Sequence, residues 1–118
     1  MTIAAIAIQE KLRQFMGEEY ADNQYCLLEI LRFFGRHPST RFSRLAIVHA
    51  LSGGKSQIER VLAYLANKGL IKANIENDIL FYQLTENNSL RSFVLEIAAL
   101  DRHQWQIVLG QTYLSSLE

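Results

Sequence analysis

The residues best suited to chemistry in this sequence lie in one short stretch, SGGKSQIERVLAYLANKGLI, from Ser52 to Ile71. Apolar residues recur in it at spacings of three and four, which predicts a helix from about Lys55 to Lys68. The apolar stripe of that helix consists of Ile58, Val61, Leu62 and Leu65. The remaining positions include Lys55, Ser56, Gln57, Glu59, Arg60, Ala63, Tyr64 and Asn67. The helix therefore presents mostly hydrogen-bonding groups opposite its apolar stripe.

That polar side matches the chemistry of reading DNA bases. In the major groove, the amides of Gln57 and Asn67 can pair with adenine, and the guanidinium of Arg60 can pair with guanine. Lys55 lies near the helix start, where phosphate groups bind. For Tyr64 a packing role is the stronger expectation. Any solvated helix face contains such residues, so the competing interpretation is an ordinary exposed surface.

Basic side chains gather around this helix. From Arg32 to Lys72 the sequence has eight basic residues, and Glu59 is the single acidic one. Arg41 and Arg44, at the start of the preceding helix, are candidates for contacts with phosphate, as is Arg36 or Lys72. Such contacts supply the salt-dependent part of DNA binding.

The composition limits the class of protein. Twelve basic and twelve acidic side chains cancel over 118 residues, although residues 23–76 alone carry eight basic and three acidic groups, a net charge of +5. A chain that is 49% hydrophobic and 20% charged is typical of one globular, mostly helical domain. No apolar run is long enough to cross a bilayer, and the N-terminal residues do not resemble a signal peptide. The lone Cys26 cannot form an internal disulfide, so we expect a cytoplasmic protein without membrane contact.

Two helices are predicted at the start of the chain. Residues 3–16 place apolar side chains on one side and charged ones on the other, and Gly17 with the acidic residues after it predicts a break. Asn23 is the expected N-cap of the next helix, a core helix that Gly35 and Pro38 end.

A short strand and a third helix are expected to follow. Residues 40–42 can pair as a minor strand, and Ser43 is a good N-cap for the helix after it. The residues of that helix expected to face inward are Leu45, Ile47, Val48 and Leu51. Ser52, Gly53 and Gly54 then turn the chain into the helix described first, which Gly69 ends.

The segment LIKANIE changes to a period of two, which predicts a half-buried strand and a β-hairpin. If Asn77 and Asp78 form a two-residue turn, the register of the hairpin is fixed. The facing pairs are then Ile75 with Leu80, Ala73 with Tyr82, and Ile71 with Leu84. One face of the hairpin becomes apolar. Beyond Asn88 helical spacing returns, as one long helix or as two with Asp101 as a cap.

This order of elements resembles the winged helix-turn-helix fold, and residues 25–88 resemble MarR-type and related bacterial transcriptional regulators. The resemblance rests on the apolar positions of the helix predicted from Lys55 to Lys68, on the sequence KGLI at its end (residues 68–71) and on the sequence YQLT at the end of the hairpin (residues 82–85). The sequence departs from the pattern at Gly53, where an apolar residue is common. It also departs at Asn88, where glycine is common and asparagine accepts left-handed geometry.

The resemblance implies a mainly α fold with a small β-hairpin, an α+β winged helix-turn-helix with extra N- and C-terminal helices. We expect a single domain over residues 1–118. Its expected parts are an N-terminal helix for packing or dimerisation (1–22), the winged helix-turn-helix core (23–88) and a C-terminal helical region for dimerisation (89–118).

The function that these observations favour is sequence-specific binding of double-stranded DNA by a homodimeric transcriptional regulator. The expected DNA-binding residues are Arg41, Arg44, Lys55, Ser56, Gln57, Arg60, Tyr64, Asn67 and Lys72. The hairpin tip argues the other way, because Glu76 and Asp78 carry carboxylates that phosphate repels. The alternative is therefore a winged-helix scaffold subunit that binds another protein and does not read DNA.

Other kinds of site have less support. The three histidines and Cys26 lack the close spacing of zinc ligands. The glycines of SGGKS lack the full spacing of a phosphate-binding loop. No nucleophile, base and orienting acid stand out as a set. We therefore expect no metal, no cofactor and no enzymatic activity, and nothing identifies a small-molecule effector.

Overall fold

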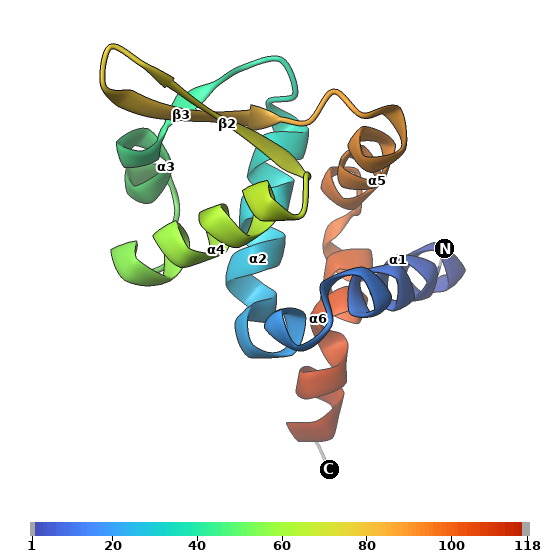
Figure 1. Cartoon of the computed structure of the whole chain (residues 1–118). Helices are drawn as coiled ribbons and strands as arrows, with labels where there is room; N and C mark the ends of the chain where they lie inside the picture. The colour runs from blue at the N-terminus through green and yellow to red at the C-terminus, as the bar shows by residue number, and fades with distance from the viewer. Residues whose placement is uncertain (1, 117–118) are drawn as a thin grey trace. The chain divides into compact units, whose positions relative to one another are not determined.

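The computed structural model describes the backbone of residues 2–116 and the side chains of residues 5–17 and 22–109. In this part the chain is mainly helical, with a small three-stranded antiparallel sheet, as expected for an α+β chain (Figure 1). Its elements are α1 (Thr2–Met16), α2 (Glu18–Arg36), β1 (Phe42–Ser43), α3 (Arg44–Ala50), α4 (Lys55–Asn67), β2 (Ile71–Glu76), β3 (Ile79–Leu84), α5 (Asn88–Ala98) and α6 (Arg102–Ser116). Of the helices described, none has both the length and the apolar character that crossing a bilayer requires.

The chain divides into two compact units. The first comprises Met1–Tyr25 and Ala99–Glu118, and the second comprises Cys26–Ala98. The second unit holds the whole sheet together with α3, α4 and α5. Helix α5 therefore belongs with the sheet, whereas the expected boundary at residue 88 assigned it to the C-terminal region.

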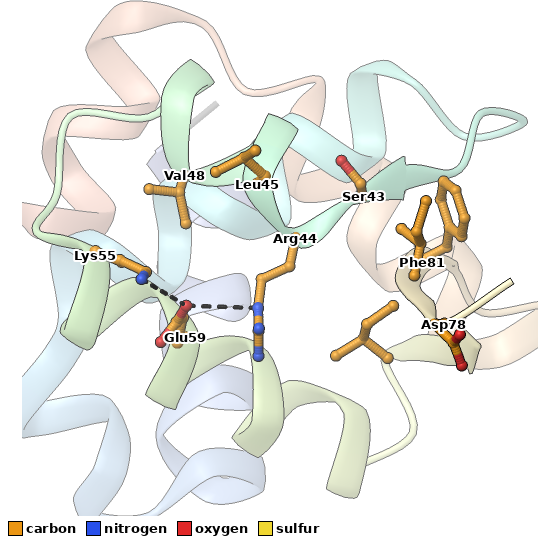
Figure 2. A pocket seen from close by; sticks show the side chains of 10 residues that line it. Ser43, Arg44, Leu45, Val48, Lys55, Glu59, Asp78 and Phe81 are labelled. Atoms are coloured by element: carbon orange, nitrogen blue, oxygen red, sulfur yellow. Dashed lines mark ion pairs between the residues drawn. The ribbon is translucent and has the colours of Figure 1, made fainter. Parts of the chain in front are cut away.

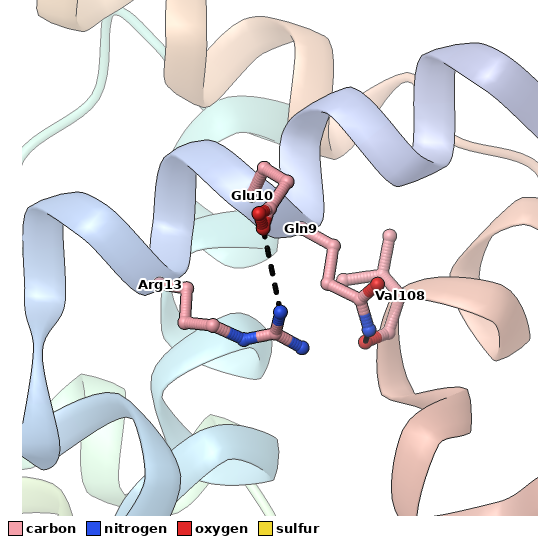
Figure 3. Close-up of polar contacts among 4 residues, drawn as sticks. All are labelled: Gln9, Glu10, Arg13 and Val108. Carbon is pink, nitrogen blue, oxygen red and sulfur yellow. Dashed lines mark hydrogen bonds and ion pairs between the residues drawn. The ribbon is translucent and has the colours of Figure 1, made fainter.

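In the first unit α1 packs against α6. Ala5, Ile8 and Leu12 are buried on one side of α1. The Gln9 side-chain amide donates a hydrogen bond to the backbone carbonyl of Val108 at 3.0 Å (Figure 3). A buried amide that finds such a partner avoids the cost of desolvation.

Residues 88–116 form two helices, which answers the question that the sequence left open. Asp101 and Gln104 form a reciprocal cap at the start of α6. The Gln104 backbone N–H donates to the Asp101 carboxylate at 2.8 Å, and the Asp101 backbone N–H donates to the Gln104 side-chain oxygen at 3.0 Å. This capping box sets where α6 begins. Asn88 is the first residue of α5 and has no positive φ, so the left-handed geometry considered for it is wrong.

Helix α2 differs from the expectation at its start. The chain is helical from Glu18 onward, so the acidic residues after Gly17 do not form a long break. Asn23 is non-helical, with φ −130° and ψ 29°, and forms a kink between two helical segments, so a helical segment does begin after Asn23 as expected. The predicted break is real at Gly17 itself, which has φ +62°.

The core of the second unit is built from the helical stripes that the sequence predicts. Leu27, Ile30, Leu31 and Phe34 of α2 are fully buried, as are Ile58, Val61, Leu62 and Leu65 of α4. Gly35 lets α2 approach α5 closely, because a Cβ there would lie 2.4 Å from the Ala98 Cβ.

The hairpin has the predicted register. Ile71 pairs with Leu84, Ala73 with Tyr82, and Ile75 with Leu80. The turn residues Asn77 and Asp78 have φ values of +51° and +67°, as a type I′ turn requires. The first strand is Phe42–Ser43 rather than residues 40–42, and it pairs with β3, so the strand order is β1-β3-β2.

Two apolar residues expected to face inward are exposed. Leu45 of α3 is 63% exposed and Ile75 of β2 is 72% exposed. Of the four inward positions expected in α3, Ile47 is fully buried, while Val48 and Leu51 are partly exposed. The apolar face of the hairpin is therefore buried near Ile71 and open near the turn.

Candidate functional site

Local hydrogen bonds hold the helix pair α3 and α4 and the turn between them. The Ser43 hydroxyl accepts from the Ala46 backbone N–H at 3.1 Å, which confirms Ser43 as the N-cap of α3. In the turn, the Ser52 hydroxyl donates to a Glu29 carboxylate oxygen at 3.1 Å. Because Glu29 belongs to α2, this bond ties the turn before α4 to the core helix.

Gly69 closes the C-terminal end of α4, as predicted. Its φ is +84°, and its N–H donates to the Ala66 carbonyl at 3.1 Å. The Leu70 N–H donates to the Leu65 carbonyl, also at 3.1 Å. This pair of bonds is a Schellman motif, which favours glycine because a Cβ is strained at positive φ. The motif directs the chain into β2 and so fixes where the hairpin leaves α4.

Four residues form what we call the outer face of α4. Ser56, Arg60, Ala63 and Asn67 are all exposed. They follow one another at spacings of four, three and four residues, which places them on one side of a helix. That side is opposite the buried stripe of α4, so a hydroxyl, a guanidinium and an amide face solvent together.

Gln57 and Tyr64 lie beside this face and are partly buried. The Lys68 ammonium nitrogen lies 5.7 Å from the centre of the Tyr64 ring, a cation–π distance. The packing role expected for Tyr64 agrees with this position. Lys72 lies on β2 and is exposed, opposite Gln83 of β3.

Glu59 joins two of the basic residues expected to contact phosphate. Its carboxylate oxygen Oε2 lies 3.4 Å from Arg44 Nε and 4.0 Å from Lys55 Nζ (Figure 2). Lys55 and Glu59 are four residues apart, a spacing at which side chains meet on a helix. One carboxylate therefore offsets part of two positive charges at the start of α3 and α4.

Arg41 has a carboxylate partner as well. Its guanidinium is hydrogen-bonded to Glu76, near the hairpin turn, and lies 4.7 Å from the centre of the Phe81 ring. The hydrogen bond to Glu76 is the main reason why the pKa of Arg41 is raised. Glu76 was expected to repel phosphate as a free carboxylate, but it is paired.

The structure thus brings the expected DNA-binding residues into three groups. Arg44 and Lys55 gather around Glu59, Arg41 joins the hairpin, and Arg60 lies on the outer face of α4. Carboxylates interrupt the basic residues in two places. The sequence could have indicated the pairing of Glu59, because it is the one acidic residue in a basic stretch. It could not have indicated the pairing of Glu76, whose partner Arg41 is 35 residues away.

A groove of about 590 Å³ lies between α3, the start of α4 and β3 (Figure 2). Its apolar lining residues are Leu45, Val48, Ile79, Leu80 and Phe81. Its charged lining residues are Arg44, Lys55, Glu59 and Asp78. Sequence periodicity did not reveal this groove, because Leu45 was expected to lie in the core.

His37 and Cys26, two other side chains that could take part in chemistry, do not line this groove. Among the residues whose side chains are described, no group of three or more His, Cys, Asp and Glu is placed to hold a metal ion. His37 packs against Phe33 and Phe42, with ring centres 5.2 and 5.6 Å away. Cys26 is buried, and burial raises the pKa of its thiol; Glu29 adds to this rise and Arg60 opposes it.

Comparison with models of known protein families, with curated proteins and with solved structures gave no match. The function is therefore inferred from the geometry of the α3–α4 region and the hairpin.

Proposed function

We propose that this chain is a winged helix-turn-helix protein that binds double-stranded DNA in a sequence-dependent manner and regulates transcription. The observation that carries the proposal is the outer face of α4. Its donors and acceptors are on Ser56, Arg60 and Asn67, and the helix that bears them follows a tight turn from α3. Such a helix can enter the major groove, where guanidinium and amide groups distinguish guanine and adenine.

The flanking basic residues support the same role. Arg44 and Lys55, at the starts of α3 and α4, are candidates for phosphate contacts, and Lys72 offers another on β2. Phosphate can replace Glu59 as the partner of Arg44 and Lys55, because a side-chain ion pair that is partly exposed costs little to open.

Dimer formation is part of the proposal. One module of this size makes few base contacts, and a pair of modules binding two half-sites multiplies them. The chain would act in the cytoplasm, where a single thiol such as Cys26 stays reduced.

Binding to a protein instead of DNA is the second candidate. The ion pairs of Arg41 and of Arg44 favour it, because paired cations attract a polyanion less than free ones. The apolar groove beside them favours it as well.

A titration of the full chain with a labelled duplex, at about 50 and about 200 mM salt, decides between the two candidates. We expect the affinity for the duplex to fall at least about tenfold at the higher salt. We expect Arg60→Ala to weaken binding by ~1–3 kcal/mol. Selection from a randomised duplex pool should then enrich a defined sequence.

Arg102→Ala is the matched control, because it removes one exposed arginine from α6 rather than from the outer face of α4. It should bind the duplex like the wild type. Binding without salt dependence, or an Arg60→Ala variant that binds as the wild type does, would contradict the DNA-binding proposal.

A further inference from the structure

The groove between α3 and β3 exposes apolar side chains to solvent. Leu45 is 63% exposed and Ile79 is 49% exposed, and both line it. The groove forms because β1 is only two residues long and the chain enters α3 at Arg44. The two residues of β1 pair with Tyr82 and Phe81 of β3, so β1 stops short of Ile79.

The hairpin tip, which we define as residues 75–79, is apolar as well. Ile75 is 72% exposed, and Ile79 is exposed on the other side of the turn. Ile75 pairs with Leu80 and Ile79 pairs with Glu76, so the two isoleucines lie on opposite faces of the hairpin, and Ile79 is the one that lines the groove. Burying such an exposed aliphatic side chain against a protein removes apolar surface from water.

The charged residues of the groove are divided between its two walls. The wall formed by α3 and α4 carries one net positive charge, which is the sum of Arg44, Lys55 and Glu59. Asp78, on the side of the hairpin, carries one negative charge. The hairpin tip of this chain therefore complements the helical wall of the same groove in both charge and apolar character.

We propose that two copies of this chain associate through this groove, with the hairpin tip of each copy lying against α3 and the start of α4 of the other. In a twofold contact the same two surfaces meet twice. Ile79 of one copy would meet Leu45 and Val48 of its partner, and Asp78 would approach Lys55. Each copy supplies both halves of the contact.

A second copy fits this groove better than a nucleic acid does. Exposed leucine and isoleucine side chains gain nothing from a phosphate backbone, and the charges lining the groove cancel. The contact covers Arg44 and Lys55, so this association differs from the DNA-bound dimer proposed above and competes with any duplex that uses those two residues. It requires no DNA and can be tested whether or not the chain binds DNA.

Cysteine cross-linking tests the contact directly. One preparation carries Leu45→Cys and a second carries Ile79→Cys, and the two full-length chains are mixed under mild oxidation. We expect a covalent dimer that contains one chain of each kind. Cys26 stays in both chains, because it is buried and common to every sample. A mixture of Leu95→Cys with Ile79→Cys is the control, since Leu95 is exposed on α5 and does not line the groove.

Sedimentation equilibrium without DNA gives the second measurement. Leu45→Glu introduces a charge at an exposed position, and we expect it to weaken association at least about tenfold, whereas Leu95→Glu leaves it unchanged. The proposal is overturned if the Leu45–Ile79 cross-link forms no faster than the Leu95 control. It is also overturned if Leu45→Glu associates as strongly as the wild type.

Discussion

At the residue scale, the position of the hairpin depends on the backbone of Gly69. A Cβ at this position would make only an ordinary contact, 3.7 Å from Leu90 Cδ1, so space does not exclude alanine. The obstacle is the φ of +84°, which costs residues other than glycine ~1–2 kcal/mol. We therefore expect Gly69→Ala to lower the free energy of unfolding by ~1 kcal/mol, measured by urea unfolding followed by circular dichroism.

Gly54→Ser is the matched control for this variant. Gly54 is the N-cap of α4, its φ is −69°, and an added Cβ meets nothing within 4 Å. Serine is a favourable N-cap, so this substitution should raise stability by a few tenths (~0.3) of a kcal/mol. If Gly69→Ala were as stable as the wild type, the left-handed backbone at Gly69 would not be needed.

At the element scale, the type I′ turn of the hairpin is not built from its best residues. Asp78 has φ +67°, where aspartate is strained and glycine is not. We expect Asp78→Gly to stabilise the chain by up to about 1 kcal/mol in urea unfolding. Asp78→Asn removes the charge and keeps a side chain that tolerates this geometry, so it should change stability little. An equal gain from both variants would assign the effect to charge instead of backbone strain.

The same hairpin shows which features the sequence predicts and which it does not. A two-residue turn fixes the register of both strands locally, and Ile71, Ala73 and Ile75 pair as expected. Leu45 is exposed against expectation, because helical spacing identifies an apolar stripe but not what covers it. Leu45 has the right spacing for the core, yet β1 ends beside it and leaves a groove.

Ion pairs between residues far apart in the sequence could not be predicted either, because only the folded sheet brings the partners together. Arg41 and Glu76 are 35 residues apart. The antiparallel pairing of β1 with β3 is what brings Arg41 near the hairpin. The basic residues of the candidate site can be predicted from helical spacing and from the local excess of basic residues. Their carboxylate partners, which decide how strongly that site attracts phosphate, depend on the folded sheet.

At the scale of the whole molecule, the charges cancel to a formal net of zero, so any attraction to DNA depends on how charge is distributed. Glu59 holds the central place in that distribution, because it is within 4.0 Å of both Arg44 and Lys55. If the proposed DNA binding is correct, a duplex must compete with this carboxylate for both cations.

Replacing Glu59 with glutamine tests that competition. Glu59→Gln keeps the shape of the side chain and removes its charge, so Arg44 and Lys55 become more available to phosphate. We expect duplex affinity to rise several-fold, and the slope of log K against log salt to steepen by up to about one unit. Glu96→Gln, at an exposed position on α5, makes the same change in net charge and should alter both quantities much less. Weaker binding by Glu59→Gln would show instead that the carboxylate orients Arg44 and Lys55 for the duplex, and that releasing them does not help binding.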